Sequence, residues 1–243
     1  MTDRQTDRQT DSKLFESFPK VRVELPDAYK KIYGEHYANN RKGKTTASYF
    51  SSRLEHWLHH KVACSASPNK FTLEIGAGTL NQLNFEIPGI AYDIVEPYKA
   101  LFLDSAHLSH IRNVYDDIKE ITGEKCYDRI TAVACFEHIC DLPDVVYKAS
   151  RLLKDDGLLC VSIPNEGRFL WKLAYTLTTG VEFKLKYGLD YDVIMRHEHV
   201  NTADEIEEVL RCCFQDVKMS LFGISKTFSL YRYYECKYPG QYR

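Results

Sequence analysis

A chain of 243 residues, 44% of them hydrophobic, is long enough for one domain with a sizeable core. Its formal net charge of -2 provides no overall field toward nucleic acid or an anionic membrane, and no stretch approaches the roughly 20 apolar residues of a membrane-spanning helix. The eight cysteines are scattered without a Cys-x-x-Cys pair, which favours buried thiols over disulfides or zinc ligands. The polar N-terminal stretch has no apolar signal core, so we expect a cytoplasmic protein.

Residues 1–12 repeat the unit Thr-Asp-Arg-Gln and offer nothing apolar to bury after Met1, so we expect this tail to be disordered. A tandem ACAG repeat in the DNA would encode this unit across four codons. The pattern therefore favours a nucleotide repeat that is read in frame over a structural repeat, the alternative being a chance or expression-derived tail. Such tracts gain or lose whole units during replication, and a four-base slip shifts the frame, which predicts phase variation of the gene.

A helical cap is predicted for residues 13–69. Its first part, 13–43, is rich in Tyr, Lys and Asn and is expected to form short helices, and residues 45–63 carry apolar side chains near helical spacing. The segment 65–69 is predicted to link this cap to the main domain, which we place at residues 70–243.

From residue 70 onward short apolar runs alternate with helical stretches, which predicts parallel strands and an α/β fold with a doubly wound sheet. We expect strands at 71–75, 91–95, 111–115, 128–134, 158–163, 216–222 and 227–235. A helix precedes the fifth strand and is expected to end at the turn Asp155-Asp156-Gly157. The last helix, 201–214, begins with a capping box from Thr202 to Glu205.

A glycine turn follows the first strand in the stretch LEIGAGT, residues 73–79. Gly76 and Gly78 allow a tight turn and the close approach of a ligand, although such a turn can also be purely structural. The next strand ends at Glu96, about 20 residues after this turn, where a carboxylate can accept hydrogen bonds from both hydroxyls of a ribose. Asp116 and Asp117 follow the third strand, where an adenine amino group could be met. The spacing thus indicates a ligand that contains a nucleoside.

The loop does not fit a dinucleotide or a nucleoside triphosphate. A dinucleotide fingerprint needs a third glycine where the chain has Asn81, and a P-loop ending at Lys44 would need a glycine in place of Ala38. Glu74, just before the loop, is unfavourable for phosphate but could orient an ammonium group. That combination suits a nucleoside that carries an amino acid.

Four stretches together resemble the class I S-adenosylmethionine-dependent methyltransferases: LEIGAGT, IVEP, YDRITAVACFEHI and ASRLLKDDGLLCVSIPN. They are similar to the small-molecule branch (type 11/12-like), which includes enzymes of bacterial surface-polysaccharide biosynthesis, over about residues 70–235. The resemblance implies a Rossmann-like, doubly wound, seven-stranded sheet with an antiparallel last strand, and S-adenosylmethionine as the cofactor.

The resemblance also implies roles for individual residues. By position, the cofactor-binding residues are Glu74, Gly76, Gly78, Thr79, Glu96, Asp116, Asp117 and Phe136. The first four would frame the methionine part, Glu96 would bind the ribose, and Asp116 or else Asp117 would meet the adenine edge. Phe136 would line the cofactor pocket. Leu80 stands where many members carry a glycine, which is expected to narrow the approach to the methionine tail.

Two histidines are candidates for the general base that a hydroxyl acceptor requires. His138 follows the fourth strand, and His199 precedes the last helix, where the family often places a histidine that faces the acceptor; each could instead have a structural role. Glu137 could orient a neighbour or cap a helix. The stretch HEH contains His197 and His199 and could form a metal site together with Glu137 or His138. Its spacing is not diagnostic of a metal site, and we expect no metal.

Residues 166–200 are expected to form a lid over the acceptor, between the fifth strand and the last helix. The aromatic side chains of this insertion could stack on sugar rings, or could form a packed hairpin or a dimer surface. Its lysines and arginines could meet a phosphate-bearing acceptor such as a nucleotide sugar, or could simply be solvated.

These observations predict methylation of a small polar acceptor. We expect O-methylation of a surface-glycan sugar or of its phosphate- or nucleotide-linked precursor, because the N-terminal repeat resembles phase-variable tracts of bacterial lipopolysaccharide and capsule genes. Methylation of another small metabolite, N-methylation and a non-catalytic cofactor-binding module remain alternatives. A nucleic-acid substrate is disfavoured, since there is no basic patch and ACFEHI stands where such enzymes carry an Asn-Pro-Pro-Tyr-like motif. A small molecule is therefore the expected partner, with a homodimer as a further option.

Overall fold

The computed structural model of the chain describes residues 15–33, 48–68 and 70–240. The disordered tail predicted for residues 1–12 lies outside the described residues, as do residues 13–14, 34–47 and 69 of the predicted N-terminal cap. No helix in the described ranges is long and apolar enough to cross a membrane.

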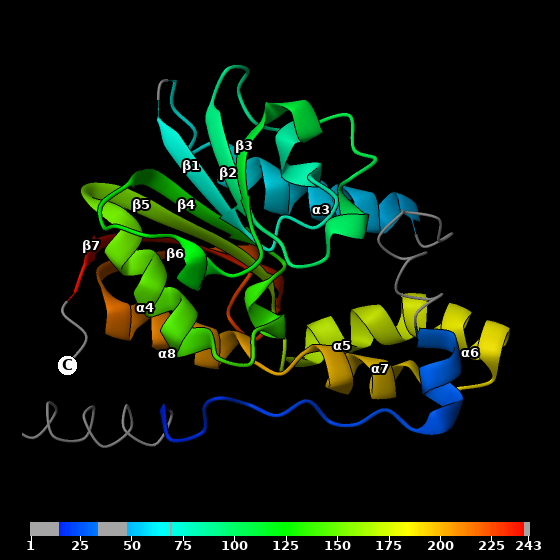
Figure 1. The fold of residues 1–243 in the computed structure, drawn as a ribbon. Coiled ribbons are helices and arrows are strands. Elements are labelled where there is room, and N and C mark those ends of the chain that lie inside the picture. Colours follow the sequence, from blue (N-terminus) through cyan, green and yellow to red (C-terminus); the bar gives the residue numbers. More distant parts are fainter. Residues whose placement is uncertain (1–14, 34–47, 69, 241–243) are drawn as a thin grey trace, which may run out of the picture.

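A single seven-stranded sheet forms the centre of the molecule, in the order β3-β2-β1-β4-β5-β7-β6 (Figure 1). Its strands are β1 (Phe71–Ile75), β2 (Ala91–Val95), β3 (Ile111–Tyr115), β4 (Tyr127–Val133), β5 (Leu153–Pro164), β6 (Phe214–Gly223) and β7 (Ser229–Pro239). The strands from β3 to β5 pair in parallel, whereas β7 is antiparallel to both β5 and β6. The doubly wound sheet with an antiparallel last strand is therefore confirmed.

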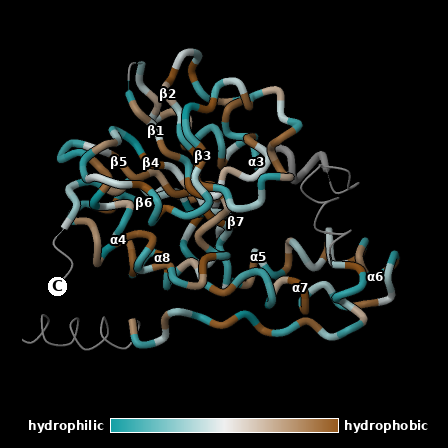
Figure 2. The backbone as a smooth tube through the Cα atoms, in the orientation of Figure 1, coloured by the Kyte–Doolittle hydropathy of each residue, from teal (hydrophilic) through white to brown (hydrophobic). Residues whose placement is uncertain are grey.

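Helices cover both faces of this sheet. Successive side chains of a strand point to opposite sides, so each strand can pack against both layers of helices. On one face, α4 (Leu142–Leu152) and α8 (Ala203–Cys213) pack in the main core with alternate residues of β5, such as Leu159 and Val161. On the other face, α3 (Ser48–Ala63) packs against the intervening Cys160 of the same strand. Figure 2 shows hydrophobic stretches in the central strands β4 and β5, as expected where both faces of a sheet are covered.

The turn Asp155-Asp156-Gly157 does not end the helix as predicted. Helix α4 ends at Leu152, and Leu153 is already extended and pairs with Tyr127 of β4. The pairing then jumps to Leu158, so the expected turn is a bulge near the start of β5. The cysteine prediction is corrected in part: all eight are free thiols, but Cys64 and Cys126 are exposed.

The insertion after β5 forms a separate helical layer, hereafter the lid. It comprises α5 (Phe169–Tyr175), the π-helix Thr176–Gly180, α6 (Val181–Tyr187) and α7 (Tyr191–Glu198). Leu25 and Tyr29 from the N-terminal segment are buried against the lid, and Figure 1 shows this segment running alongside these helices. Only residues 27–33 of that segment form more than one turn of helix.

The N-terminal segment also ties the lid to the sheet. The Arg22 guanidinium donates hydrogen bonds to the backbone carbonyls of His197, Glu198 and His138, at 3.0, 2.8 and 2.5 Å. The Lys20 ammonium binds a carboxylate oxygen of Glu205 on α8 at 2.5 Å. These contacts hold the end of α7 against the carboxyl edge of β4.

Candidate functional site

Two cavities meet at the carboxyl edge of the parallel strands. The smaller, of about 550 Å³, lies by the ends of β2 and β3, and the larger, of about 730 Å³, extends from the glycine turn to the lid. Gly76, Ala134, His138 and Glu198 line both cavities, so the two lie next to each other. Open α/β sheets bind ligands at this edge, where neighbouring connections diverge.

The glycine turn has the strained conformation that its sequence predicts. Gly76 has a φ of 71°, and a Cβ atom there would lie 2.3 Å from the sulfur of Cys135, so no larger residue fits. Gly78 has a φ of 52° and Leu80 one of 65°. The Leu80 side chain is fully buried with Tyr92, Ile94 and Phe102, and lines neither cavity. It therefore does not narrow the larger cavity, and its burial compensates for a backbone conformation that favours glycine.

Glu96 joins the glycine turn to the end of β2. Its side chain is buried, and its two carboxylate oxygens accept hydrogen bonds from the backbone amides of Gly78 and Tyr98, each at 2.9 Å. Each oxygen keeps a second lone pair that can accept another hydrogen bond, and Glu96 lines the smaller cavity. The carboxylate is thus fixed in place before any ligand arrives.

Asp116 and Asp117 line the same cavity but differ in what they bind. Asp117 caps the short helix Ile118–Glu120 by accepting a hydrogen bond from the Lys119 amide at 2.8 Å. The Asp116 carboxylate is about half exposed and pairs with the Lys99 ammonium at 3.2 Å. Because Asp117 is engaged locally, Asp116 is better placed to bind a ligand.

Glu74 contributes a buried carboxyl group to the larger cavity, which Thr79 also lines. The Tyr92 hydroxyl donates a hydrogen bond to it at 3.0 Å. Burial raises the pKa of Glu74 to about 8, only partly opposed by this hydrogen bond. A carboxyl group in this state is neutral at pH 7 and gains a charge readily when a cation comes next to it.

Phe136 is not where its position in the sequence implied. It is fully buried in the main core and lines neither cavity. The chain turns sharply at Ala134, whose φ is 46°, and this turn directs Phe136 into the core. Ala134 and Cys135 line the smaller cavity in its place.

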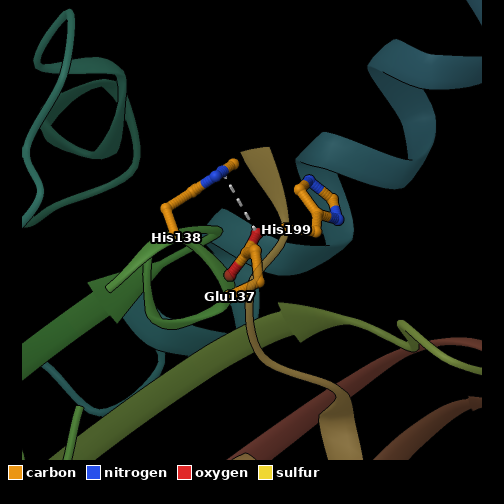
Figure 3. A group of neighbouring side chains, drawn as sticks. All are labelled: Glu137, His138 and His199. Atoms are coloured by element: carbon orange, nitrogen blue, oxygen red, sulfur yellow. Dashed lines mark ion pairs between the residues drawn. The ribbon is translucent and has the colours of Figure 1, made fainter. Parts of the chain in front are cut away.

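The two predicted histidines come together although 60 residues separate them. His138 lies in the short helix Phe136–His138 and His199 directly follows α7; their rings meet edge to face with centroids 4.8 Å apart. Figure 3 shows the carboxylate of Glu137 next to both rings. His197 instead contacts the backbone carbonyl of Val23 through Nδ1 at 2.7 Å, so the pair within HEH does not share a site.

Glu166 is the site residue that the sequence analysis missed. Its Oε2 atom lies 2.6 Å from Nδ1 of His199 and accepts a hydrogen bond from the Trp171 indole at 2.8 Å. Burial alone would lower the pKa of His199, but the hydrogen bond to Glu166 and the charges of Glu137 and Glu166 outweigh it and raise that pKa. The sequence signal was the acidic residue directly after Pro164 and Asn165, where β5 ends.

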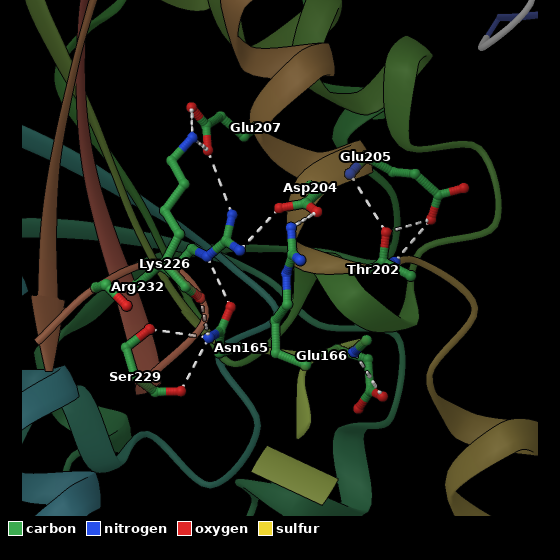
Figure 4. A network of polar contacts seen from close by, with 12 residues as sticks. Asn165, Glu166, Thr202, Asp204, Glu205, Glu207, Lys226, Ser229 and Arg232 are labelled. Carbon is green, nitrogen blue, oxygen red and sulfur yellow. Dashed lines mark hydrogen bonds and ion pairs between the residues drawn. The ribbon is translucent and has the colours of Figure 1, made fainter. Parts of the chain in front are cut away.

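A buried polar network holds Glu166 in position (Figure 4). The preceding Asn165 donates to the backbone carbonyl and the hydroxyl of Ser229, and accepts a hydrogen bond from the fully buried Arg232 at 2.7 Å. Arg232 also binds carboxylate oxygens of Asp204 and Glu207 on α8, at 2.7 and 3.3 Å. The end of β5 is therefore fixed to β7 and α8, which keeps Glu166 beside His199.

The lid supplies aromatic side chains but no cations to the larger cavity. Trp171, Tyr175 and Tyr191 line it, whereas Phe183 is buried inside the lid and Phe169 is exposed. Among the described lining residues there is no lysine or arginine, and the acidic ones are Glu55, Glu74, Asp104, Glu137 and Glu198. The basic residues of the lid lie elsewhere, so they do not mark a phosphate site in this cavity.

A family model described as a methyltransferase domain matches residues 48–211. No curated protein matches the sequence. Among solved structures, a SAM-dependent methyltransferase of Thermotoga maritima, described as a possible histamine N-methyltransferase, aligns with a TM-score of 0.57 at 16% identity, over 87% of this chain and 98% of that one.

Two further structures have ligands in their descriptions. The 1,6-didemethyltoxoflavin-N1-methyltransferase of Burkholderia thailandensis, bound to its substrate and S-adenosylhomocysteine, aligns with a TM-score of 0.53 at 17% identity, over 90% of this chain and 95% of that one. A phosphoethanolamine N-methyltransferase of Haemonchus contortus aligns with a TM-score of 0.55 at 13% identity, over 77% of this chain and 53% of that one. At these identities the likeness shows the fold alone.

Proposed function

The chain belongs to the methyltransferase-domain family, and from this premise we propose that it transfers a methyl group from S-adenosylmethionine to an oxygen atom of a small polar acceptor. The observation that carries the proposal is the pair of adjacent cavities. One contains Glu96 beside the glycine turn, and the other reaches from that turn to two histidines and an aromatic lid.

The residues around the glycine turn fit the cofactor. Glu96 can accept hydrogen bonds from both ribose hydroxyls on the lone pairs that its two backbone contacts leave, and Asp116 can meet the adenine edge. Glu74 would receive the ammonium group of the methionine part, which compensates for the cost of charging a buried carboxyl group. Gly76 and Gly78 let the backbone approach the ligand closely.

S-adenosylmethionine supplies a methyl group activated on a sulfonium: an acceptor oxygen bonds to the methyl carbon, the carbon–sulfur bond breaks with its electron pair on sulfur, and the hydroxyl proton leaves. The chain must therefore position the acceptor oxygen and help it to lose that proton. His138 lines both cavities and His199 lines the larger one, and we assign the activation of the acceptor to these two residues.

The lining of the larger cavity favours an uncharged, hydroxyl-rich acceptor. Trp171, Tyr175 and Tyr191 offer flat apolar faces with polar ends, which suit a sugar ring. The acidic lining disfavours a phosphate close to the reacting atom, so a phosphate- or nucleotide-linked precursor would carry its phosphate outside this cavity. A surface-glycan sugar stays the proposed acceptor, with the repeat in residues 2–12 as its support.

A second candidate is N-methylation of an amine. The five acidic residues that line the larger cavity would attract a cationic acceptor as well as they would repel an anionic one. An amine would have to lose its proton before it attacks, and a histidine could accept that proton.

Calorimetry with S-adenosylmethionine is the first test of the proposal, and absence of binding would refute both candidates. A screen with cofactor labelled in the methyl group should then compare neutral sugars, sugar phosphates, nucleotide sugars and small amines. Label on a sugar hydroxyl supports the main proposal, whereas label only on amines supports the second candidate. Binding without transfer to any acceptor would favour a cofactor-binding module.

A further inference from the structure

Three side chains with metal-binding atoms converge on the larger cavity. Glu137, His138 and His199 each offer one ligand atom, and these atoms lie within 4.8 Å of one another (Figure 3). The Nε2 atom of His138 is 3.8 Å from a carboxylate oxygen of Glu137. Around a cation with bonds of about 2.1 Å, tetrahedral ligand atoms are about 3.4 Å apart, so small side-chain rotations would complete the geometry.

Both imidazole rings are held from their far sides. Nδ1 of His138 lies 3.0 Å from the backbone carbonyl of Glu198, and Nδ1 of His199 lies 2.6 Å from the carboxylate of Glu166. Both partners only accept hydrogen bonds, so each Nδ1 carries the proton and each ring has its lone pair on Nε2. Histidines that bind metals are oriented in this way, by a carbonyl or carboxylate on the other nitrogen.

A general base would need only one such histidine. Here two rings meet at 4.8 Å beside a carboxylate that is almost completely buried. Glu166 and Glu198 add further negative charge around the pair, and the described residues that line the larger cavity include no lysine or arginine. A cation at this point would offset the cost of placing these carboxylates together.

The donor atoms restrict the kind of cation. Two imidazole nitrogens and one carboxylate suit Zn²⁺, Mn²⁺, Fe²⁺ or Co²⁺ better than Ca²⁺ or Mg²⁺, which prefer oxygen ligands alone. Three protein ligands also leave coordination positions open, as in catalytic rather than structural metal sites. Since all three residues line the larger cavity, those open positions would face the acceptor.

We propose that Glu137, His138 and His199 bind one divalent transition-metal cation, and that this cation binds and activates the acceptor. The second part rests on the proposed function. A hydroxyl group bound to the cation would lose its proton to water at a lower pH than a free hydroxyl group does. The resulting alkoxide oxygen would then bond to the methyl carbon, while the carbon–sulfur bond breaks and its electron pair stays on sulfur. The histidines then act as ligands, in place of the direct base and the metal-free site expected from the sequence.

A five-coordinate cation would have two open positions beside its three protein ligands, and these would also select the acceptor. A molecule with two neighbouring oxygens, such as a vicinal diol of a sugar, can occupy both positions and so present one oxygen in a fixed place. A lone alcohol of similar size cannot. We therefore expect acceptors with adjacent oxygens to be methylated and their mono-deoxy analogues to be poor acceptors.

The test uses the full chain after treatment with a chelator and dialysis. Titration with Co²⁺ should show one site per chain, with the visible absorption of a four- or five-coordinate ion, and Zn²⁺ should displace it. His138→Ala and His199→Ala should abolish this absorption. Glu166→Gln should weaken Co²⁺ binding by about 10–100-fold, because the His199 ring loses the carboxylate that orients it. His107→Ala is the matched control, since His107 contacts Asn84 on the surface, and it should bind Co²⁺ as the parent does.

Binding of S-adenosylmethionine is measured on the same samples to separate the two proposals. Cofactor binding without any Co²⁺ site, or a Co²⁺ site that survives both histidine substitutions, would overturn the metal site and leave the proposed function. A Co²⁺ site in a chain that does not bind the cofactor would overturn the link to methyl transfer. Full turnover by the metal-free chain would overturn the activating role. Near-ultraviolet circular dichroism of each variant should match the parent, so that lost binding is not lost folding.

Discussion

Replacing Glu74 with glutamine should make the ligand-free protein more stable at high pH. The pKa of Glu74 is raised from 4.5 to about 8 by burial, and each unit corresponds to about 1.4 kcal/mol, so charging this group costs the folded state about 5 kcal/mol. Between these two pKa values the folded chain holds a proton that the unfolded chain has lost. The free energy of unfolding therefore falls as the pH rises from 4.5 to 8. Glutamine keeps an acceptor for the Tyr92 hydroxyl but has no proton to lose.

Thermal unfolding from pH 5 to 8.5 measures this difference. We expect Glu74→Gln to unfold at about the same temperature as the parent near pH 5 and on the order of 10 °C higher at pH 8.5. Asp156→Asn, which removes an exposed carboxylate, is the matched control and should follow the parent at every pH. Parallel curves for the parent and Glu74→Gln would refute the reasoning.

The same carboxyl group should couple cofactor binding to proton release. An ammonium group next to Glu74 favours its charged form, so binding of S-adenosylmethionine at pH 7 should release a proton. The calorimetric enthalpy should then depend on the ionisation enthalpy of the buffer, and this dependence should disappear in Glu74→Gln, together with part of the affinity. A buffer-independent enthalpy in the parent would contradict the assignment of the ammonium group.

Three further changes test the cofactor end of the site and the N-terminal repeat. Glu96→Ala should weaken cofactor binding at least tenfold, because charged hydrogen bonds of about 1.5–3 kcal/mol are lost. It should also lower the unfolding temperature, because the backbone amides of Gly78 and Tyr98 lose their acceptor. An unchanged Kd would argue against the ribose assignment. Gly76→Ala should abolish cofactor binding, since the added methyl group would lie 2.3 Å from a sulfur atom, and retained affinity by calorimetry would show that the turn can open. Deletion of residues 2–12 should leave the cofactor Kd unchanged, and a marked loss would show that the repeat contributes to the site. Sequencing the locus across colonies should reveal a varying number of ACAG units, whereas a constant number would remove the support for phase variation.

Much of the sheet could be predicted because its signals are local. The first three strands match their predicted ranges, and the box from Thr202 to Glu205 caps α8 as expected. The glycine turn was predictable for the same reason: a positive φ at Gly76 and Gly78 is a property of the residue itself. Glu96 follows from the turn, since parallel strands bring their carboxyl ends to one edge.

By itself, then, the sequence determined the order of the elements, the glycine turn and the carboxylate that faces it, because periodicity and backbone preference act over a few residues. Only the tertiary structure decided which way side chains point and which distant residues meet. One turn at Ala134 directs Phe136 into the core, and the packing of α7 brings His199, but not His197, to His138. Glu166 meets His199 across 33 residues through a network anchored on α8 and β7. Such contacts depend on the packing of the whole domain, which no spacing in the sequence encodes.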